Sequence, residues 1–492
     1  MSITRRAFLS LSCAGMLSTL SPLKTWAGFD PLWRSGLPVG RPIDTSVLEI
    51  FKIGPGPSSS HTIAPMKAGN DFLALAKALP QEQLASADML RVRLFNSMSS
   101  TGIGHHTDKA ILAGLLGEEP ETCSGELLDG LFAQPNDTRT VAIGSVRLPF
   151  SRQNIVFEKE HRKAPVSDVF TISLHAGEKT LLEREYYSVG GGFLQWKGWT
   201  PPERGKPRHS FDSMNGLLQL CQSGLSIPQI MLENEMAITG LSKATILKRL
   251  EDIVLAMDSS VTAGLSIEGK LEGPYKLERR AASMYKEALA LPAEERFLAS
   301  LSAFAHAAAE ENSQGHRIVT APTAGSAGVM PALVHMLLSE RKKAMPALID
   351  GLLTASVVGM LIKRHASVAG ADVGCQGEIG SASAMSAALL AQVQGEAPEI
   401  IENAAEHALE HHLGMTCDPV DGYVQIPCIA RCAMGAVKAW NAFLMAKTGR
   451  GTFHPVGLDV TIRTMAATGQ DMDARYRETA QGGLALFYVQ GC

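Results

Sequence analysis

The pattern of apolar and polar positions changes at about residue 205. Upstream, over about 46–200, short apolar stretches alternate with polar turns, which is typical of an α/β domain. A last strand begins at Tyr186 and runs into a glycine loop that ends at Phe193. The other elements expected here are strands at 92–95, 141–148, 155–157 and 169–174 and a helix at 105–116.

Downstream, over 205–492, apolar residues recur at helical spacing, and Gly-, Ser- and Cys-rich loops separate the helical stretches. The expected helices are 230–238, 244–256, 281–291, 298–311, 330–338, 348–364, 381–393 and 400–411. The predicted fold class is therefore an N-terminal α/β domain followed by an all-α domain. We expect the functional site of the all-α domain to be built from loops at helix starts.

The N-terminus has the pattern of an export signal. Arg5 and Arg6 precede a moderately apolar stretch, and Thr25 and Ala27 provide small residues for cleavage. We interpret 1–27 as a twin-arginine signal, which the twin-arginine export machinery would use to move the folded protein to the periplasm, and 28–45 as a linker. The alternatives are a disordered tail or a start-codon artefact, and the protein would then be cytoplasmic.

Composition narrows the class of protein. The chain has 492 residues, of which 45% are hydrophobic and 19% charged, which is ordinary for a globular enzyme. Its net charge of −4 carries no overall signature of nucleic-acid binding. There are eight cysteines. Disulfide frameworks belong mostly to short secreted chains, so cysteines near Gly, Asp and Pro in a long chain favour metal binding.

Four cysteines are candidate metal ligands: Cys375, Cys417 and Cys428 in a C-terminal block, and Cys492 at the end of a glycine-containing tail. Thiolates are the usual ligands of iron–sulfur clusters, and three fixed thiolates leave one iron of a cubane open. Cys492 could cover that iron until substrate displaces it. The alternatives are zinc, which favours Cys-x-x-Cys pairs, and buried cysteines that act as small apolar residues.

Three further segments carry candidate chemistry. Rigid Gly-Pro turns at 54–57 precede Ser58, Ser59, Ser60, His61 and Thr62, whose hydroxyl and N–H groups can hold a carboxylate, unless the loop is a solvated turn. The helix start at 104–110 favours an anion, and we expect one of its two histidines to face a cleft. The small residues at 320–328 allow either a ligand or a neighbouring helix to approach closely.

Together these motifs resemble the bacterial iron–sulfur L-serine dehydratases (L-serine ammonia-lyases) of the single-chain type. The resemblance covers about 45–492, and the N-terminal extension departs from it. The matching motifs are SSSHT at 58–62, GHHTDKA at 104–110, YYSVGGGF at 186–193, TAPTAGSAG at 320–328, CQGEIGSASAM at 375–385 and CDPVDGYVQIPC at 417–428. The N-terminal domain is similar to the substrate-sensing domain of some phosphoglycerate dehydrogenases.

The resemblance implies a 4Fe-4S cluster held by Cys375, Cys417 and Cys428, with Cys492 on the fourth iron at rest. It also implies elimination of water from L-serine to give pyruvate and ammonia, and a homodimer. His61 and His105 are the candidate bases, and the sequence does not choose between them. The expected substrate-binding residues are Ser58, Ser59, Ser60, Thr62, Thr107, Thr323, Gly325 and Ser326. The rival functions are elimination from L-threonine or L-cysteine, and an iron–sulfur serine sensor without turnover.

Overall fold

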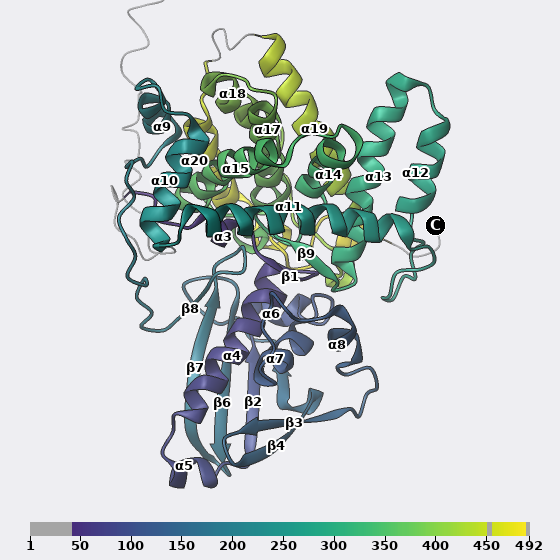
Figure 1. Cartoon of the computed structure of the whole chain (residues 1–492). Helices are drawn as coiled ribbons and strands as arrows, with labels where there is room; N and C mark the ends of the chain where they lie inside the picture. The colour runs from purple at the N-terminus through teal and green to yellow at the C-terminus, as the bar shows by residue number, and fades with distance from the viewer. Residues whose placement is uncertain (1–41, 450–454, 489–492) are drawn as a thin grey trace, which may run out of the picture.

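The computed structural model describes residues 42–449 and 455–488, and it has two parts (Figure 1). A sheet with its helices forms the lower part in this view, and the remaining helices gather above it. The predicted fold class, an α/β domain followed by an all-helical region, is confirmed. The expected signal at 1–27 and the terminal Cys492 lie outside the described residues.

The α/β part is built on a five-stranded sheet of order β5-β2-β6-β7-β8. Strand β2 runs parallel to β5, and the other neighbours are antiparallel. Alternate residues of β2 are buried and form a core with the helices α4 and α7. The bounds are β2 Met89–Leu94, β5 Ile155–Phe157, β6 Val169–Ala176, β7 Lys179–Ser188, β8 Leu194–Trp196, α4 Ala64–Lys77 and α7 Thr107–Leu115.

One expectation for this part is wrong. The stretch 141–148 is not a single strand but most of a hairpin, in which β3 (Thr138–Ile143) pairs antiparallel with β4 (Val146–Ser151). The chain reverses at Gly144, whose φ of 58° is a backbone conformation that glycine adopts at little cost. Apolar residues lie on both arms of the hairpin, so the apolar pattern conceals the turn.

In the upper part, all eight predicted helical stretches are helical. Helix α15 is long and apolar enough to cross a membrane by length and composition, but 78% of that segment is buried within the protein, as in a core helix. The bounds are α10 Ile227–Thr239, α11 Lys243–Ser266, α12 Ala281–Ala290, α13 Ala293–Ser313, α14 Val329–His335, α15 Met345–His365, α17 Ser381–Val393 and α18 Pro398–Glu410, with α9 Met214–Cys221, α19 Cys428–Thr448 and α20 Leu458–Asp471 in addition.

The two parts meet at a short ladder. The described chain starts against the helical core with α3 (Val47–Ile50) and then forms β1 (Ile53–Pro55). Strand β1 pairs antiparallel with β9 (Arg317–Val319) of the helical part, at the junction seen in Figure 1. The serine-rich segment, expected as a loop or solvated turn, instead forms the buried π-helix η1 (Ser59–Ile63) shortly after β1. The ladder therefore holds this segment against the helical part.

Candidate active site

Three cysteine thiols converge on one cavity at the junction of the two parts. Cys375 directly precedes the π-helix η4 (Gln376–Gly380), Cys417 lies in a loop, and Cys428 is the first residue of α19. All three are free thiols, and all line a small cavity of about 20 Å³. The structure therefore brings together three of the four predicted cysteines, two of them at helix starts.

A carboxylate lies among these thiols. Glu378 Oε2 is 3.7 Å from the sulfur atoms of both Cys375 and Cys417. The Thr323 hydroxyl donates to Glu378 Oε1 over 3.1 Å. A Cβ atom at Gly325 would lie 2.7 Å from the same oxygen, so only glycine leaves room for the carboxylate. Sequence reasoning missed Glu378, although its position one helical turn after Cys375 was an available signal.

The cavity concentrates acidic groups away from water. Burial raises the pKa of the Cys428 thiol and of the Glu378 carboxyl. The hydrogen bond with Cys375 and then burial raise the pKa of the Cys417 thiol. Such groups lose their protons readily only beside a cation, and sulfur donors select soft metals. The residues present therefore fit a thiolate-bound metal centre.

His105 faces the cavity from the α/β part. Its Nδ1 lies 2.9 Å from the carbonyl oxygen of Thr101, which can only accept, so Nδ1 carries the proton. This leaves the lone pair of Nε2 free, 3.4 Å from Oε1 of Glu478. Burial lowers the pKa of His105 to about 4, so the ring is neutral at neutral pH. A neutral imidazole with a free lone pair in a cavity is chemically able to accept a proton.

His61 lies behind His105, with the two ring centroids 4.7 Å apart. Its Nδ1 is 2.8 Å from the hydroxyl of Ser60, and its Nε2 is 3.2 Å from that of Ser97 and 4.0 Å from Oδ1 of Asp168. Burial and the nearby His105 lower the pKa of His61 well below its ordinary value. His61 does not line the thiol cavity, in contrast to His105.

The predicted substrate-binding residues fall into three groups. Ser58 and Gly325 line the cavity. Four others contact groups in or behind the cavity. Ser60 contacts His61 behind it, and Thr62 donates to the His105 carbonyl over 2.7 Å. Thr323, whose hydroxyl is 3.1 Å from that of Ser326, binds Glu378. Ser59 and Thr107 are buried but do not line the cavity.

A C-terminal segment, residues 474–488, closes one side of the cavity and is called the tail segment below. The Cys417 N–H donates to the Tyr476 carbonyl, and the Glu478 N–H donates to the Cys417 carbonyl, each over 2.8 Å. The Ser97 hydroxyl donates to the Glu478 carbonyl over 3.1 Å. These bonds hold the buried Glu478 side chain in the cavity. Glu478 was missed because nothing in the sequence indicates which residue of the tail turns inward.

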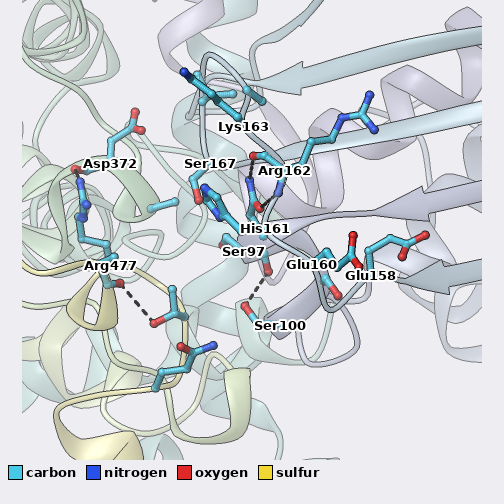
Figure 2. A pocket seen from close by; sticks show the side chains of 18 of the residues that line it. Ser97, Ser100, Glu158, Glu160, His161, Arg162, Lys163, Ser167, Asp372 and Arg477 are labelled. Atoms are coloured by element: carbon cyan, nitrogen blue, oxygen red, sulfur yellow. Dashed lines mark hydrogen bonds between the residues drawn. The ribbon is translucent and has the colours of Figure 1, made fainter.

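The same segment separates the thiol cavity from a larger pocket of about 700 Å³, shown in Figure 2. Arg477 and Thr479 line this outer pocket, whereas Glu478 between them lines the inner cavity. Figure 2 shows Arg477 beside Asp372 on one wall and the loop at 158–163 on the other. The tail segment is thus the partition between the outer pocket and the thiols.

Comparison with known proteins identifies the family. Residues 46–199 match the family model described as serine dehydratase beta chain, and residues 222–485 match serine dehydratase alpha chain. An L-serine dehydratase of Streptomyces coelicolor is 40% identical over 458 residues, which are 90% of this chain and 99% of the relative. The Haemophilus influenzae L-serine dehydratase is 39% identical over 461 residues, with the same two coverages. L-serine dehydratase 2 of Escherichia coli is 39% identical over 466 residues, again with 90% and 99% coverage. The chain belongs to the bacterial single-chain L-serine dehydratase family.

Proposed function

We propose that this protein is an L-serine ammonia-lyase that eliminates water from L-serine and yields pyruvate and ammonia. The relatives that match almost the whole described chain are L-serine dehydratases. The observation that carries the proposal is the meeting of three free thiols, two carboxylates and a neutral histidine in one buried cavity. This combination supplies metal ligands and a proton acceptor within reach of one small substrate.

Cys375, Cys417 and Cys428 would hold a 4Fe-4S cluster, with Cys492, outside the described residues, as ligand to the fourth iron in the resting enzyme. The cluster would supply, when bound, an iron that stabilises the departing hydroxyl group as a Lewis acid. The second cysteine on α19, Cys432, directs its sulfur to the Gly325 carbonyl oxygen at 3.4 Å instead. Cys432 is therefore left out of the proposed ligand set.

His105 is the better placed of the two candidate bases. Its Nε2 would take the Cα proton of serine, while Thr101 keeps the ring in the required tautomer. The electron pair of the broken Cα–H bond forms the Cα–Cβ double bond, and the β-hydroxyl leaves, so that one water is lost in total. The aminoacrylate tautomerises to an imine, which water hydrolyses to pyruvate and ammonia.

The remaining cavity groups suit a zwitterionic amino acid. The Glu378 and Glu478 carboxyls lie where they can accept hydrogen bonds from the substrate ammonium group, and the Ser58 hydroxyl can donate to its carboxylate. Ser58 is held by the N–H of His61, which donates to its hydroxyl over 3.2 Å. The serine-rich loop would thus bind substrate with Ser58 and position the histidines with Ser60 and Thr62.

The decisive experiment is anaerobic reconstitution of the protein without residues 1–27, followed by assay of pyruvate from L-serine, L-threonine and L-cysteine. We expect visible absorbance of the cluster together with pyruvate from L-serine, and loss of both in air. Replacement of Cys375, Cys417 or Cys428 by Ser should abolish the absorbance and the activity. Cys432→Ser is the matched control and should keep both. A reconstituted cluster that binds L-serine without turnover would refute the lyase and favour a sensor.

A further inference from the structure

A second cavity, of about 390 Å³, lies where the glycine loop after β7 meets the end of α15. Lysines from three separate segments line it: Lys52 just before β1, Lys67 on α4, and Lys363 in the last turn of α15. The first two flank the serine-rich loop in sequence, and the third comes from the core of the helical part. None of them belongs to the thiol cavity.

The three ammonium groups gather around the loop 190–193. Lys52 Nζ donates to the Gly191 carbonyl over 2.8 Å, and Lys67 Nζ donates to the Gly192 carbonyl over 3.2 Å. Lys52 Nζ and Lys363 Nζ lie 3.6 Å and 4.2 Å from the centre of the Phe193 ring. Positive φ angles at all three glycines of the loop produce this arrangement of the carbonyls.

The cluster shares its cavity with three carboxylates, those of Asp44, Glu49 and Asp71. Within residues 42–449 and 455–488, none of the three lysines forms a salt bridge with them. Glu49 is bound by Arg204 over 2.6 Å. Asp71 accepts from Arg184 over 3.0 Å and from the Tyr186 hydroxyl over 2.6 Å. Two of the three carboxylates therefore already pair with arginine, and the third, Asp44, acts on Lys363 without forming a salt bridge with it.

Repulsion within the cluster adds to the cost of burial. Lys52 is only 9% exposed, and burial followed by the charge of Lys67 lowers its pKa well below the ordinary value. Burial also lowers the pKa of Lys67 and of Lys363, and the charge of Glu49 offsets part of this effect at both. Ammonium groups that lie close together and are poorly screened by water are stabilised strongly by one shared anion, because that anion offsets the repulsion between each pair of them.

We propose that this pocket binds a small dianion, a phosphate group or a dicarboxylate, through the ammonium groups of Lys52, Lys67 and Lys363. The cavity is large enough for such a ligand, and lysine binds phosphate as a point charge. The bound anion would join α4 of the α/β part to α15 of the helical part. It would also lie close to the active site, because α4 continues the π-helix η1 (Ser59–Ile63) that carries His61.

The test is calorimetric titration of the full-length protein with inorganic phosphate and, separately, with succinate at constant ionic strength. We expect saturable binding of at least one of the two anions, with a stoichiometry of about one per chain. The anion that binds more tightly shows whether the pocket suits a phosphate group or a dicarboxylate. Lys363→Met should weaken that binding at least tenfold. Lys179→Met, which changes an exposed lysine at the start of β7, should leave it unchanged. Binding that survives unchanged in Lys363→Met and Lys67→Met, or no saturable binding of either anion, overturns the proposal.

Thermal unfolding separates anion binding from a purely structural role of the lysines. If the cluster awaits an anion, Lys363→Met relieves repulsion, so its Tm without dianions should equal or exceed that of the wild type, and the rise with added dianion should disappear. If Lys363 instead serves the C-terminal carbonyls of α15, the variant loses stability and a dianion raises neither Tm, which refutes the proposal. Neither readout requires turnover, so the result does not depend on the proposed dehydratase activity.

Discussion

The two buried histidines differ in which ring nitrogen they leave available. The carbonyl of Thr101 fixes the proton of His105 on Nδ1 and directs the lone pair of Nε2 to the cavity. The Ser97 hydroxyl gives its one proton to the Glu478 carbonyl, so Nε2 of His61 donates to Ser97 and Nδ1 of His61 faces the Ser60 hydroxyl. These contacts distinguish two side chains that the sequence alone leaves equivalent.

His105→Asn should therefore lower kcat by about 10²–10⁴-fold, the usual contribution of a general base, and leave the visible absorbance of the reconstituted protein unchanged. Steady-state pyruvate formation under anaerobic conditions measures the effect. His61→Asn should cost less, because that ring supports the cavity from behind. His306→Asn, at another buried histidine on α13, is the control and should retain activity. A larger loss in His61→Asn than in His105→Asn would reverse the assignment.

His412 makes stability depend on pH. Burial lowers its pKa in the folded state to about 4, against 6.5 in the unfolded chain, so the unfolded chain binds the extra proton between these values. Stability is therefore complete above pH 6.5 and falls as the pH is lowered. Between pH 7 and pH 5 the loss from this residue should be about 2 kcal/mol.

Urea unfolding at both pH values should show a loss that is about 2 kcal/mol smaller in His412→Gln than in the wild type, because the other buried histidines contribute equally to both proteins. His411→Gln changes the exposed neighbour and is the control. An equal loss of unfolding free energy in the wild type and in His412→Gln would contradict the prediction.

At the scale of single elements, the sequence predicts helices better than their connections. Apolar periodicity identified eight helices of the upper part, but α9, α19 and α20 of that part and α4 of the α/β part were not predicted. Helix α19 begins at Cys428, the last residue of the CDPVDGYVQIPC motif, where no helix was predicted. A hairpin with apolar residues on both arms, such as β3–β4, has the apolar pattern of a single strand. Only the glycine at the turn, Gly144, indicates that the chain reverses.

The residues of the candidate site could be predicted from the sequence where reactive side chains lie together in short motifs. Cys375, Cys417, Cys428, Ser58 and His105 were all named from sequence and meet in one cavity. Glu478 and Asp168 were not, because each gains its role only from distant chain segments that place it beside a histidine. Thr323 was named but binds Glu378 and does not line the cavity, a distinction that depends on side-chain direction.

The tail segment should undock when Gly483 gains a side chain. Its φ of 59° disfavours other residues, and a Cβ atom there would lie 2.1 Å from Oδ2 of Asp418, the acceptor of the Leu484 N–H. Gly483→Ala should therefore shift the docking equilibrium about tenfold or more, in line with a strain of about 1–3 kcal/mol.

Limited proteolysis measures this shift as a faster rate of cleavage within 474–488. Gly395→Ala also adds a side chain at a positive φ, of 77°, but with no atom within 4 Å of the added carbon, so it is the control. Equal cleavage rates in Gly483→Ala and the wild type would show that Gly483 does not govern docking.

At the scale of the whole molecule, neither part contains a complete site. The α/β part supplies the histidines and Ser58, while the helical part supplies the thiols and both cavity glutamates. A short ladder, β1–β9, and the Lys52 pocket lie on the same junction. Catalysis therefore depends on how the two parts are held together, in addition to the fold of each.

The proposed homodimer would be tested by light scattering of the purified protein.

The proposed destination of the molecule depends on residues 1–27. Because the twin-arginine route reads the arginine pair, replacing Arg5 and Arg6 by Lys should keep the protein in the cytoplasm, whereas the unchanged protein should appear in the periplasm without its first 27 residues. Cell fractionation with mass spectrometry of the N-terminus measures both. An unchanged protein that stays cytoplasmic with residues 1–27 intact would refute export.

The bond between Ser97 and Glu478 joins residues 381 positions apart, and this separation has a consequence for synthesis. Because the chain leaves the ribosome from its N-terminal end, the histidines and then each of the three thiols emerge before Glu478 does. Until then the cavity lacks the wall that Glu478 and its neighbours provide. The order of translation thus makes all three thiols available before the segment that covers them exists, which would allow the proposed cluster to form first.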